Sequence, residues 1–229
     1  MIFRLIKLCA TIGAICIPMI VHAAPITWDT AQDSSGSGDV STNGSVVEAV
    51  NLTSAAGTII VNGVEFTNSD SIFPNSARPE IDFLAGETTG DSDYDALLEG
   101  LDYGGGASFS FDLENLVVGV LYEIQVWFAD LRDCCSGRNM YYGDGVTSVM
   151  LNASAGGFGQ YAIGSFVADS TGQALYLQAD GFPNVHLTAY QVRTVPQLQT
   201  LQVHTVPEPG TLFLLGLGLA GMGLYRRNH

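Results

Sequence analysis

Residues 121–128 read LYEIQVWF, and this stretch decides the fold class. Its apolar side chains at positions 122, 124, 126 and 128 alternate with Glu123, Gln125 and Trp127. A period of two residues is typical of a β-strand with one face on a core, because successive side chains point to opposite faces. We therefore expect a half-buried strand here.

A second strong signal is the dipeptide Asn62-Gly63, which separates two runs rich in β-branched residues, 58–61 and 64–67. Both central residues of such a turn take positive φ, which Asn and Gly tolerate, so the sequence predicts a β-hairpin. The run 107–113 alternates as well, with Phe109 and Phe111 on one face. Further strands are predicted at 46–52, 146–151, 161–167, 174–178 and 187–192, and the helix candidate is 94–99.

Many short strands separated by turn residues indicate an all-β protein, and we expect a single jelly-roll-like β-sandwich. Residues 24–194 have a length suited to one domain with its own core. Residues 195–206, which contain Pro196 and several glutamines, are the predicted linker to the C-terminal segment.

Residues 1–23 have the composition of a secretory signal peptide. Arg4 and Lys7 precede an uncharged apolar run from 8 to 20, and small or tolerated residues lead up to Ala23. We predict export with cleavage after Ala23. Two of the four cysteines lie inside this segment and would leave with it.

The last 23 residues, 207–229, form a three-part pattern. Its parts are Pro207, Glu208 and Pro209, then the uncharged run 211–225, then Arg226 and Arg227. As a helix the run would be about 22 Å long, whereas the hydrocarbon core of a bilayer is about 30 Å thick. We therefore expect a short, temporary transmembrane helix with its arginine pair in the cytoplasm. An ordinary permanent anchor is the alternative.

This pattern resembles the PEP-CTERM sorting signal of bacterial proteins that the membrane protease exosortase processes. The resemblance implies that residues 207–229 are a sorting and anchor segment, and that exosortase is a partner. It implies export through the inner membrane, transient anchoring there, and a final location at the cell surface or in the extracellular matrix.

Between its two ends the chain is strongly acidic. Residues 24–206 contain no lysine and only four arginines against 22 acidic residues, a formal net charge of −18. Such a surface repels nucleic acid, whose binding depends on Lys and Arg, and it repels anionic lipid. We expect no nucleic-acid partner. Solubility, cation binding or a neutral polymer partner would each explain the charge.

A second resemblance concerns the body. Residues 115–119 and 121–130, together with 185–192, resemble a middle strand and the closing strand of malectin-like and galactose-binding-like jelly rolls. The resemblance implies a β-sandwich of a kind that often binds carbohydrate. It carries over no catalytic residues.

The densest group of functional side chains lies at 130–142, directly after the strongest strand. Arg and Asp can hydrogen-bond to sugar hydroxyls, and Tyr can stack on a sugar ring. The candidate ligand-binding residues are Asp130, Arg132, Arg138, Tyr141 and Tyr142. The alternative is a loop that Arg132 and Arg138 merely hold in place by pairing with nearby aspartates.

Cys134 and Cys135 are adjacent in the same segment. After export they lie in an oxidising compartment, where they could close an eight-membered disulfide ring, cross-link two chains or stay free. The sequence leaves these alternatives open. A zinc site would need more ligands than this pair.

Other chemistry has weak support. Asp91, Asp93 and Asp95 have the spacing of an EF-hand calcium loop, but Ala96 stands where that loop requires Gly. Metal ligands stay unassigned, and Ca²⁺ is the one cofactor that the acidic composition leaves open. The chain has no Gly-x-Ser-x-Gly elbow and no paired-histidine motif, so we expect no enzyme.

The leading hypothesis is an exported, exosortase-processed surface or matrix protein that associates with exopolysaccharide and binds carbohydrate. The alternative is a purely structural surface protein without a specific ligand. A glycan-active enzyme, the third hypothesis, needs two carboxylates about 5–10 Å apart. Exposed rings of Trp127, Tyr141 or Tyr142 beside Arg132 or Arg138 would favour carbohydrate binding, and buried rings would favour the structural alternative.

Overall fold

The computed structural model describes residues 25–52, 57–69, 72–73 and 82–196. The predicted signal peptide and the sorting segment lie outside the described residues, as does most of the linker. In the described part of the chain, no helix is both long enough and apolar enough to cross a membrane.

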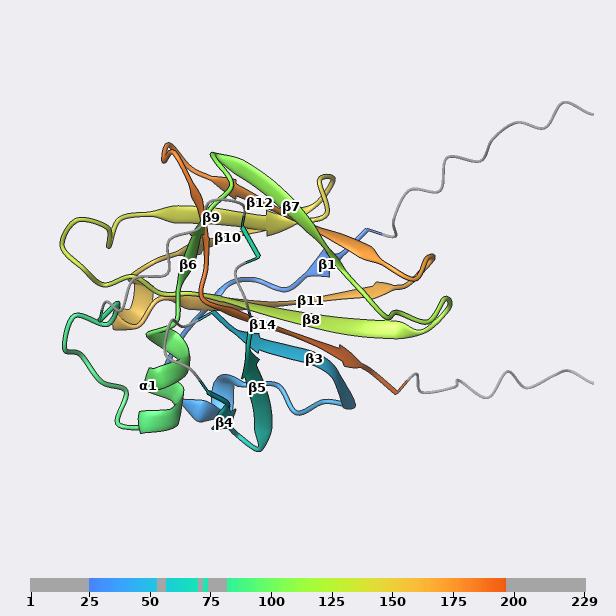
Figure 1. The fold of residues 1–229 in the computed structure, drawn as a ribbon, viewed down its shortest axis with the longest axis horizontal. Helices are drawn as coiled ribbons and strands as arrows, with labels where there is room; N and C mark the ends of the chain where they lie inside the picture. The colour runs from blue at the N-terminus through green and yellow to red at the C-terminus, as the bar shows by residue number, and fades with distance from the viewer. Residues whose placement is uncertain (1–24, 53–56, 70–71, 74–81, 197–229) are drawn as a thin grey trace, which may run out of the picture. The chain divides into compact units, whose positions relative to one another are not determined.

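Two sheets stack on each other in the body (Figure 1). The larger sheet has the strand order β1-β11-β8-β14-β3-β5-β4, and β2 pairs with β11. Its strands are β1 (Thr27–Trp28), β2 (Gln32–Asp33), β3 (Ser45–Asn51), β4 (Ile59–Val61), β5 (Val64–Asn68), β8 (Leu121–Phe128), β11 (Gln160–Val167) and β14 (Ala189–Thr194).

The smaller sheet has the order β10-β9-β12-β7, and a separate pair, β6 with β13, lies beside the two sheets. These strands are β6 (Asp102–Gly104), β7 (Ser108–Leu113), β9 (Asn139–Gly143), β10 (Ser148–Asn152), β12 (Gln173–Ala179) and β13 (Val185–Leu187). The helices are α1 (Ser92–Leu98) and the short 3₁₀ turns η1 (Ser37–Asp39) and η2 (Ala155–Gly157).

The main core lies between the two sheets, which makes the body a β-sandwich. The apolar residues of β8 predicted to face a core are all buried there. They share this cluster with side chains from the smaller sheet, among them Leu113, Met140, Tyr142, Leu151, Leu175 and Leu177. The alternation in residues 121–128 therefore predicts this face correctly.

The prediction that β8 is only half-buried is wrong. On its other face Gln125 and Trp127 are 0% exposed and Glu123 is 9% exposed. Trp127 belongs to a second core and packs edge-on against Phe66, with 5.7 Å between the ring centroids. Helix α1 contributes Leu97 and Leu98, among others, to the same core. Segments distant in sequence thus cover the face that the sequence assigned to solvent.

Polar side chains on that face form what we call the closed cluster: Gln125, Gln191 and Arg193 beneath the backbone of residues 39–44. Gln125 Nε2 donates to the Asp39 carbonyl at 2.7 Å, and Gln191 Nε2 donates to Gln125 Oε1 at 2.7 Å. Arg193 Nε donates to the Asn43 carbonyl at 2.6 Å. Burying these groups is tolerated because each finds a partner.

Two local predictions, the hairpin at residues 58–67 and the short helix after Asp91, are confirmed. β4 and β5 form the predicted hairpin, and Asn62 and Gly63 take φ of 50° and 74°. The predicted helix also forms, two residues earlier than expected. It begins at Ser92 because the Asp91 carboxylate accepts hydrogen bonds from the backbone amides of Asp93 and Tyr94, as an N-cap does.

Two strand predictions need correction. The single strand expected at 187–192 is divided at Thr188: β13 pairs with β6, and β14 enters the larger sheet. Residues 139–143, expected in a loop, form strand β9 between β10 and β12. Both differences affect the site, because the first diverts His186 out of the larger sheet and the second turns Tyr141 and Tyr142 to opposite faces of a strand.

The two ends of the described chain lie at the same end of the sheets (Figure 1). The Val195 amide donates to the Leu121 carbonyl at the start of β8, at 2.9 Å. Thr27 in β1 pairs with Ser165, and Ser165 pairs with Glu123 in β8. Asp130 follows the opposite end of β8, so the candidate site lies about one strand length away from Pro196.

Candidate binding pocket

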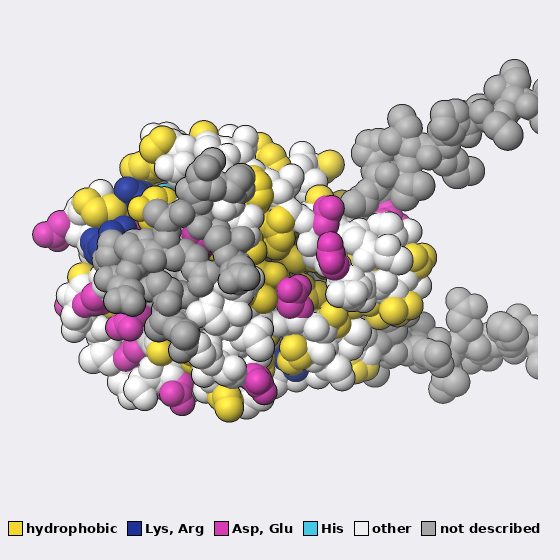
Figure 2. Space-filling view, viewed as in Figure 1, with side chains coloured by type: hydrophobic (Ala, Val, Ile, Leu, Met, Phe, Trp, Pro, Cys, Tyr) yellow, Lys and Arg dark blue, Asp and Glu magenta, His cyan; other side chains and the backbone are white. Residues whose placement is uncertain are grey.

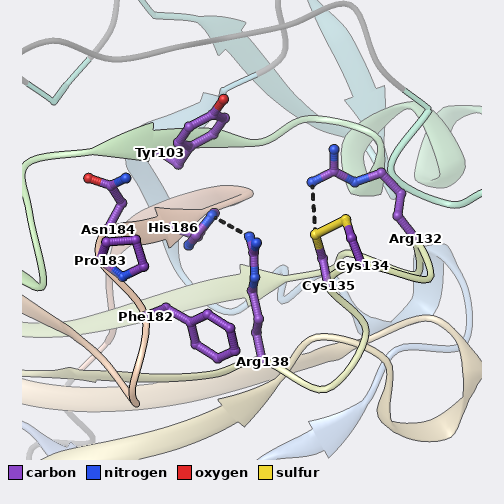
Figure 3. Close-up of a pocket in the computed structure, with 9 residues that line it drawn as sticks. All are labelled: Tyr103, Arg132, Cys134, Cys135, Arg138, Phe182, Pro183, Asn184 and His186. Carbon is purple, nitrogen blue, oxygen red and sulfur yellow. Dashed lines mark hydrogen bonds between the residues drawn. A yellow bond between two sulfur atoms is a disulfide. The ribbon is translucent and has the colours of Figure 1, made fainter.

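Three segments that are far apart in sequence meet at the end of β8 and enclose a pocket of about 260 Å³ (Figure 3). They are the loop after β8, strand β6, and the turn that leads into β13. The residues that line the pocket are Tyr103, Arg132, Cys134, Cys135, Arg138, Phe182, Pro183, Asn184 and His186.

Ala153 holds both ends of the loop between β8 and β9 through backbone hydrogen bonds. The Asp130 amide donates to the Ala153 carbonyl, and the Ala153 amide donates to the Arg138 carbonyl, each at 2.9 Å. Between these points the Cys135 amide donates to the Arg132 carbonyl at 2.8 Å, which closes a tight turn. The backbone therefore fixes where both arginines leave the chain.

Asp130 and Arg132 form a bidentate ion pair. Arg132 Nε lies 2.7 Å from Asp130 Oδ1, and its Nη2 lies 2.8 Å from Oδ2. The carboxylate is fully buried, and the guanidinium also lies 4.5 Å from the centroid of the Phe83 ring. This two-point geometry is the strong form of an arginine–carboxylate contact. Arg132 is thus largely committed to holding the loop, as the structural alternative expected.

Arg138 is less constrained. Its Nη1 lies 2.9 Å from His186 Nε2 and 3.8 Å from Asp130 Oδ2. Its Nε is buried and has no hydrogen-bond partner among the described residues. Its guanidinium lies 5.0 Å from the centroid of the Phe182 ring. Asp130 is therefore shared by two guanidinium groups, and the pocket keeps an excess of positive charge.

The pocket end is distinct on the molecular surface. Figure 2 shows most of the visible basic side chains gathered at one end of this face, where acidic side chains also lie, while further acidic side chains are spread over the rest. The chain as a whole has a formal net charge of −15, so a group of arginines is unusual on this surface. A cavity lined by one sign of charge concentrates ligands of the other sign.

His186 is placed by the β6–β13 pair, in which it lies opposite Tyr103. The two rings stack with centroids 5.3 Å apart, and the Tyr142 hydroxyl donates to the His186 carbonyl at 2.7 Å. Burial, and then the neighbouring Arg138 guanidinium, lower the pKa of His186 to about 4. The ring is therefore neutral at pH 7, and its Nε2 accepts from Arg138, which can only donate.

The two adjacent cysteines are bonded to each other in the structure, with Cα atoms 3.7 Å apart. Their disulfide forms one wall of the pocket, and Arg132 Nη2 lies 3.7 Å from Cys135 Sγ (Figure 3). Cys135 is buried, whereas Cys134 is exposed. The pair therefore contributes a compact apolar surface next to the guanidinium groups.

Of the predicted binding residues, the structure brings Asp130, Arg132 and Arg138 together and separates the two tyrosines from them. Tyr142 is fully buried beneath His186, and burial raises its pKa well above the usual value. Tyr141 points from the other face of β9 toward a hollow that it shares with Tyr176 and Gln178. Trp127 is also fully buried.

Sequence reasoning missed the aromatic residues that do line the pocket, Tyr103 and Phe182, both partly exposed. It also left His186 unplaced and did not consider Asn184. Phe182, Pro183 and Asn184 form a turn just before the closing strand, which is a recognisable position for rim residues. No local pattern singles out Tyr103, because its place in the pocket depends on pairing with β13.

The acidic run near Asp91 serves the helix. Besides the cap by Asp91, the Asp95 carboxylate accepts from the Thr89 amide at 2.9 Å and so fixes the turn before α1. Throughout the residues that the structure describes, no three His, Cys, Asp or Glu side chains gather in a way that could hold a metal ion.

The comparisons with known proteins concern the C-terminal end. Residues 205–227 match the family model described as the PEP-CTERM protein-sorting motif. This range contains the predicted sorting residues, which are Pro207, Glu208, Pro209, Arg226 and Arg227. No curated protein and no solved structure matches the chain. The motif implies export and processing by exosortase, and therefore a protein of the cell surface or the extracellular space.

Proposed function

We propose that this protein, exported and processed by exosortase, associates with extracellular polysaccharide and binds one of its sugar units in the pocket at the end of β8. The C-terminal run 211–225 anchors it in the inner membrane only until exosortase acts. The observation that carries the binding proposal is the pocket itself, which combines an incompletely satisfied arginine with two partly exposed aromatic rings.

The pocket has the parts that carbohydrate recognition uses. Arg138 and Asn184 supply hydrogen-bond donors, and Tyr103 and Phe182 supply apolar faces. Its volume of about 260 Å³ lies just below the usual range of pockets for drug-sized ligands, which suits a single sugar unit. The resemblance of residues 115–130 and 185–192 to malectin-like jelly rolls supports the same proposal.

We propose binding rather than catalysis. The described residues that line the pocket include no aspartate or glutamate, whereas most glycoside hydrolases use a pair of carboxylic acids. The carboxylate nearest to the arginines, Asp130, is fully buried and held by Arg132.

A purely structural surface protein is the second candidate, and one observation favours it. Trp127 and Tyr142, two of the three rings expected to stack on sugars, are buried in the two cores. On that view Tyr103 and Phe182 serve only to cover His186 and Arg138.

The test is binding of the purified chain to the exopolysaccharide of the producing cell, with calcium and with a chelator. We expect saturable binding, and we expect Arg138→Ala to weaken it at least tenfold. Tyr141→Ala is the control and should leave the affinity unchanged, because Tyr141 points into a different hollow. If binding is lost only when the chelator is present, the sugar is bound at a calcium-dependent site and not by Arg138. If the polysaccharide does not bind under either condition, the structural candidate replaces this proposal.

A further inference from the structure

We infer that the sugar unit preferred by the pocket carries a carboxylate, so that the ligand class is a uronic acid within a glycan. This inference rests on the proposed function and adds the chemical class of the ligand. It is carried by the charge balance of the pocket and by the donors that Arg138 leaves without a partner.

The charge balance favours an anion. Both ion pairs at the pocket are made with the same buried carboxylate, that of Asp130. Arg132 takes both carboxylate oxygens at 2.7 and 2.8 Å, whereas Arg138 reaches one of them only at 3.8 Å. One negative charge thus faces two positive charges, and a ligand carboxylate would supply the missing one.

The donors favour a carboxylate in particular. A guanidinium has five N–H groups in a fixed fork, and this fork matches the two oxygens of a carboxylate. In Arg138 Nη1 is engaged with His186 and Nε is buried without a partner, so the terminal nitrogens, Nη2 above all, are the donors that face a ligand in the pocket. The guanidinium is held on both sides, by His186 and by the Phe182 ring, so its orientation is set before a ligand arrives.

The walls favour a sugar as the carrier of that carboxylate. Tyr103, Phe182 and the Cys134–Cys135 disulfide surround the arginines with compact apolar surface, and Asn184 adds an amide at the rim. The apolar faces would cover the C–H face of a sugar ring, and the amide would reach a hydroxyl.

The rest of the surface limits how much charge the glycan can have. The strongly acidic body repels a dense polyanion, although salt screens this repulsion beyond about 8–10 Å. A uronic acid that is isolated among neutral sugars would gain the contact with Arg138 and avoid most of the repulsion. We therefore expect a sparsely charged glycan.

The test compares three oligosaccharides of the same length on the full chain in detergent micelles, by isothermal titration calorimetry. They differ in one terminal unit, which is galacturonic acid, its methyl ester or galactose. We expect the acid to bind at least about tenfold tighter than the ester, as one charge-assisted contact would give. Asn184→Asp, which adds a negative charge at the rim, should weaken binding of the acid about tenfold, while Asn184→Ser serves as the matched uncharged control.

Each other result is decisive. Equal affinity for the acid, the ester and galactose would overturn the uronate inference and leave the carbohydrate proposal standing. Failure of all three to bind, while the exopolysaccharide of the producing cell still binds, would also overturn the uronate inference, whereas failure of that polysaccharide as well would reject the proposed function. Equal competition by free acetate or by an acidic peptide would show that the pocket recognises a carboxylate without a sugar, which also overturns the inference. If Asn184→Asp does not fold, Arg138→Gln tests the same preference, because it removes the positive charge and should equalise the acid and the ester.

Discussion

Two arginines, Arg193 on β14 of the larger sheet and Arg138 in the loop before β9, show different uses of one side chain. In the closed cluster Arg193 is 4% exposed, and all three of its guanidinium nitrogens donate hydrogen bonds. Nε donates to the Asn43 carbonyl at 2.6 Å and Nη2 donates to the Gly44 carbonyl at 3.1 Å. Nη1 donates to Gln191 Oε1 at 3.1 Å. In the pocket Arg138 is partly exposed and makes one hydrogen bond, to His186.

The difference lies in what surrounds each guanidinium. Backbone carbonyls of residues 43 and 44 close over Arg193, and Gly44, with φ of 67°, lets that segment approach so closely that a Cβ there would lie 1.7 Å from the Thr194 carbonyl oxygen. Around Arg138 the pocket is lined by rings, a disulfide and Asn184, and the nearest carboxylate, that of Asp130 at 3.8 Å, is already held by Arg132. A saturated arginine holds the fold, whereas an unsaturated one in a pocket is available to a ligand.

The largest expected effect is the loss of Arg193. Arg193→Met should lower the free energy of unfolding by about 3 kcal/mol or more, because it leaves buried acceptors without their charged donor. Arg138→Met should cost only about 1 kcal/mol, since it removes one hydrogen bond and a long 3.8 Å contact with Asp130, which Arg132 still holds. Urea unfolding of residues 25–196, followed by tryptophan fluorescence, measures both. Equal costs would mean that Arg138 is as structural as Arg193.

The next largest effect is the pH dependence of stability that arises from His186 in the pocket. His186 has a pKa of about 4 in the folded protein and an ordinary value of about 6.5 when unfolded. Between these two pH values the unfolded chain binds more protons at His186 than the folded protein does. The contribution of neutral His186 to the free energy of unfolding is therefore complete above about pH 6.5, and it is lost as the pH falls toward 4. The loss should reach about 2–3 kcal/mol.

The measurement is the free energy of unfolding at several pH values for the wild type and for His186→Gln. The variant should lose less stability than the wild type between pH 6.5 and 4, because carboxylates contribute equally to both. Parallel curves would show that His186 is not held neutral by its surroundings. Arg193→Lys, a substitution in the closed cluster, is the control. It should lose as much stability between pH 6.5 and 4 as the wild type does.

The smallest effect is expected from the disulfide. Ordinary disulfides stabilise by about 2–4 kcal/mol because they close a long loop in the unfolded chain, but Cys134 and Cys135 are adjacent and close none. Reduction with dithiothreitol should therefore lower the melting temperature by less than about 4 °C, which corresponds to about 1 kcal/mol at this size. A larger drop would mean that this disulfide contributes substantially to the stability of the fold.

The sequence was informative wherever the structure is determined locally. Asn62 and Gly63 specify their hairpin by backbone preference alone, and the alternation in 121–128 identifies the strand and its inner face. The same alternation misled about the outer face, because Gln125 and Trp127 are covered by segments more than 25 residues away in sequence. A periodic pattern reports side-chain direction, and burial depends on what packs there afterwards.

The candidate site was predictable in part for the same reason. Asp130, Arg132 and Arg138 lie on one short loop, so their proximity follows from the sequence. Tyr103, Phe182 and His186 join them only through the β6–β13 pairing, which no local signal announces. Tyr141 and Tyr142 were assigned to the loop because the brief alternation in 139–143 is too short to stand out as a strand.

The placement of the pocket has a consequence for many copies acting together. The eight residues of β8 separate the pocket from the point where the chain continues past Pro196, a distance of roughly 25 Å at about 3.3 Å per residue. Copies that were joined to one surface at this point would therefore carry their pockets about one strand length away from it. If the pocket binds a uronic acid as proposed, a glycan that repeats this unit would engage several copies at once, and weak single contacts would add up to firm adhesion through effective concentration.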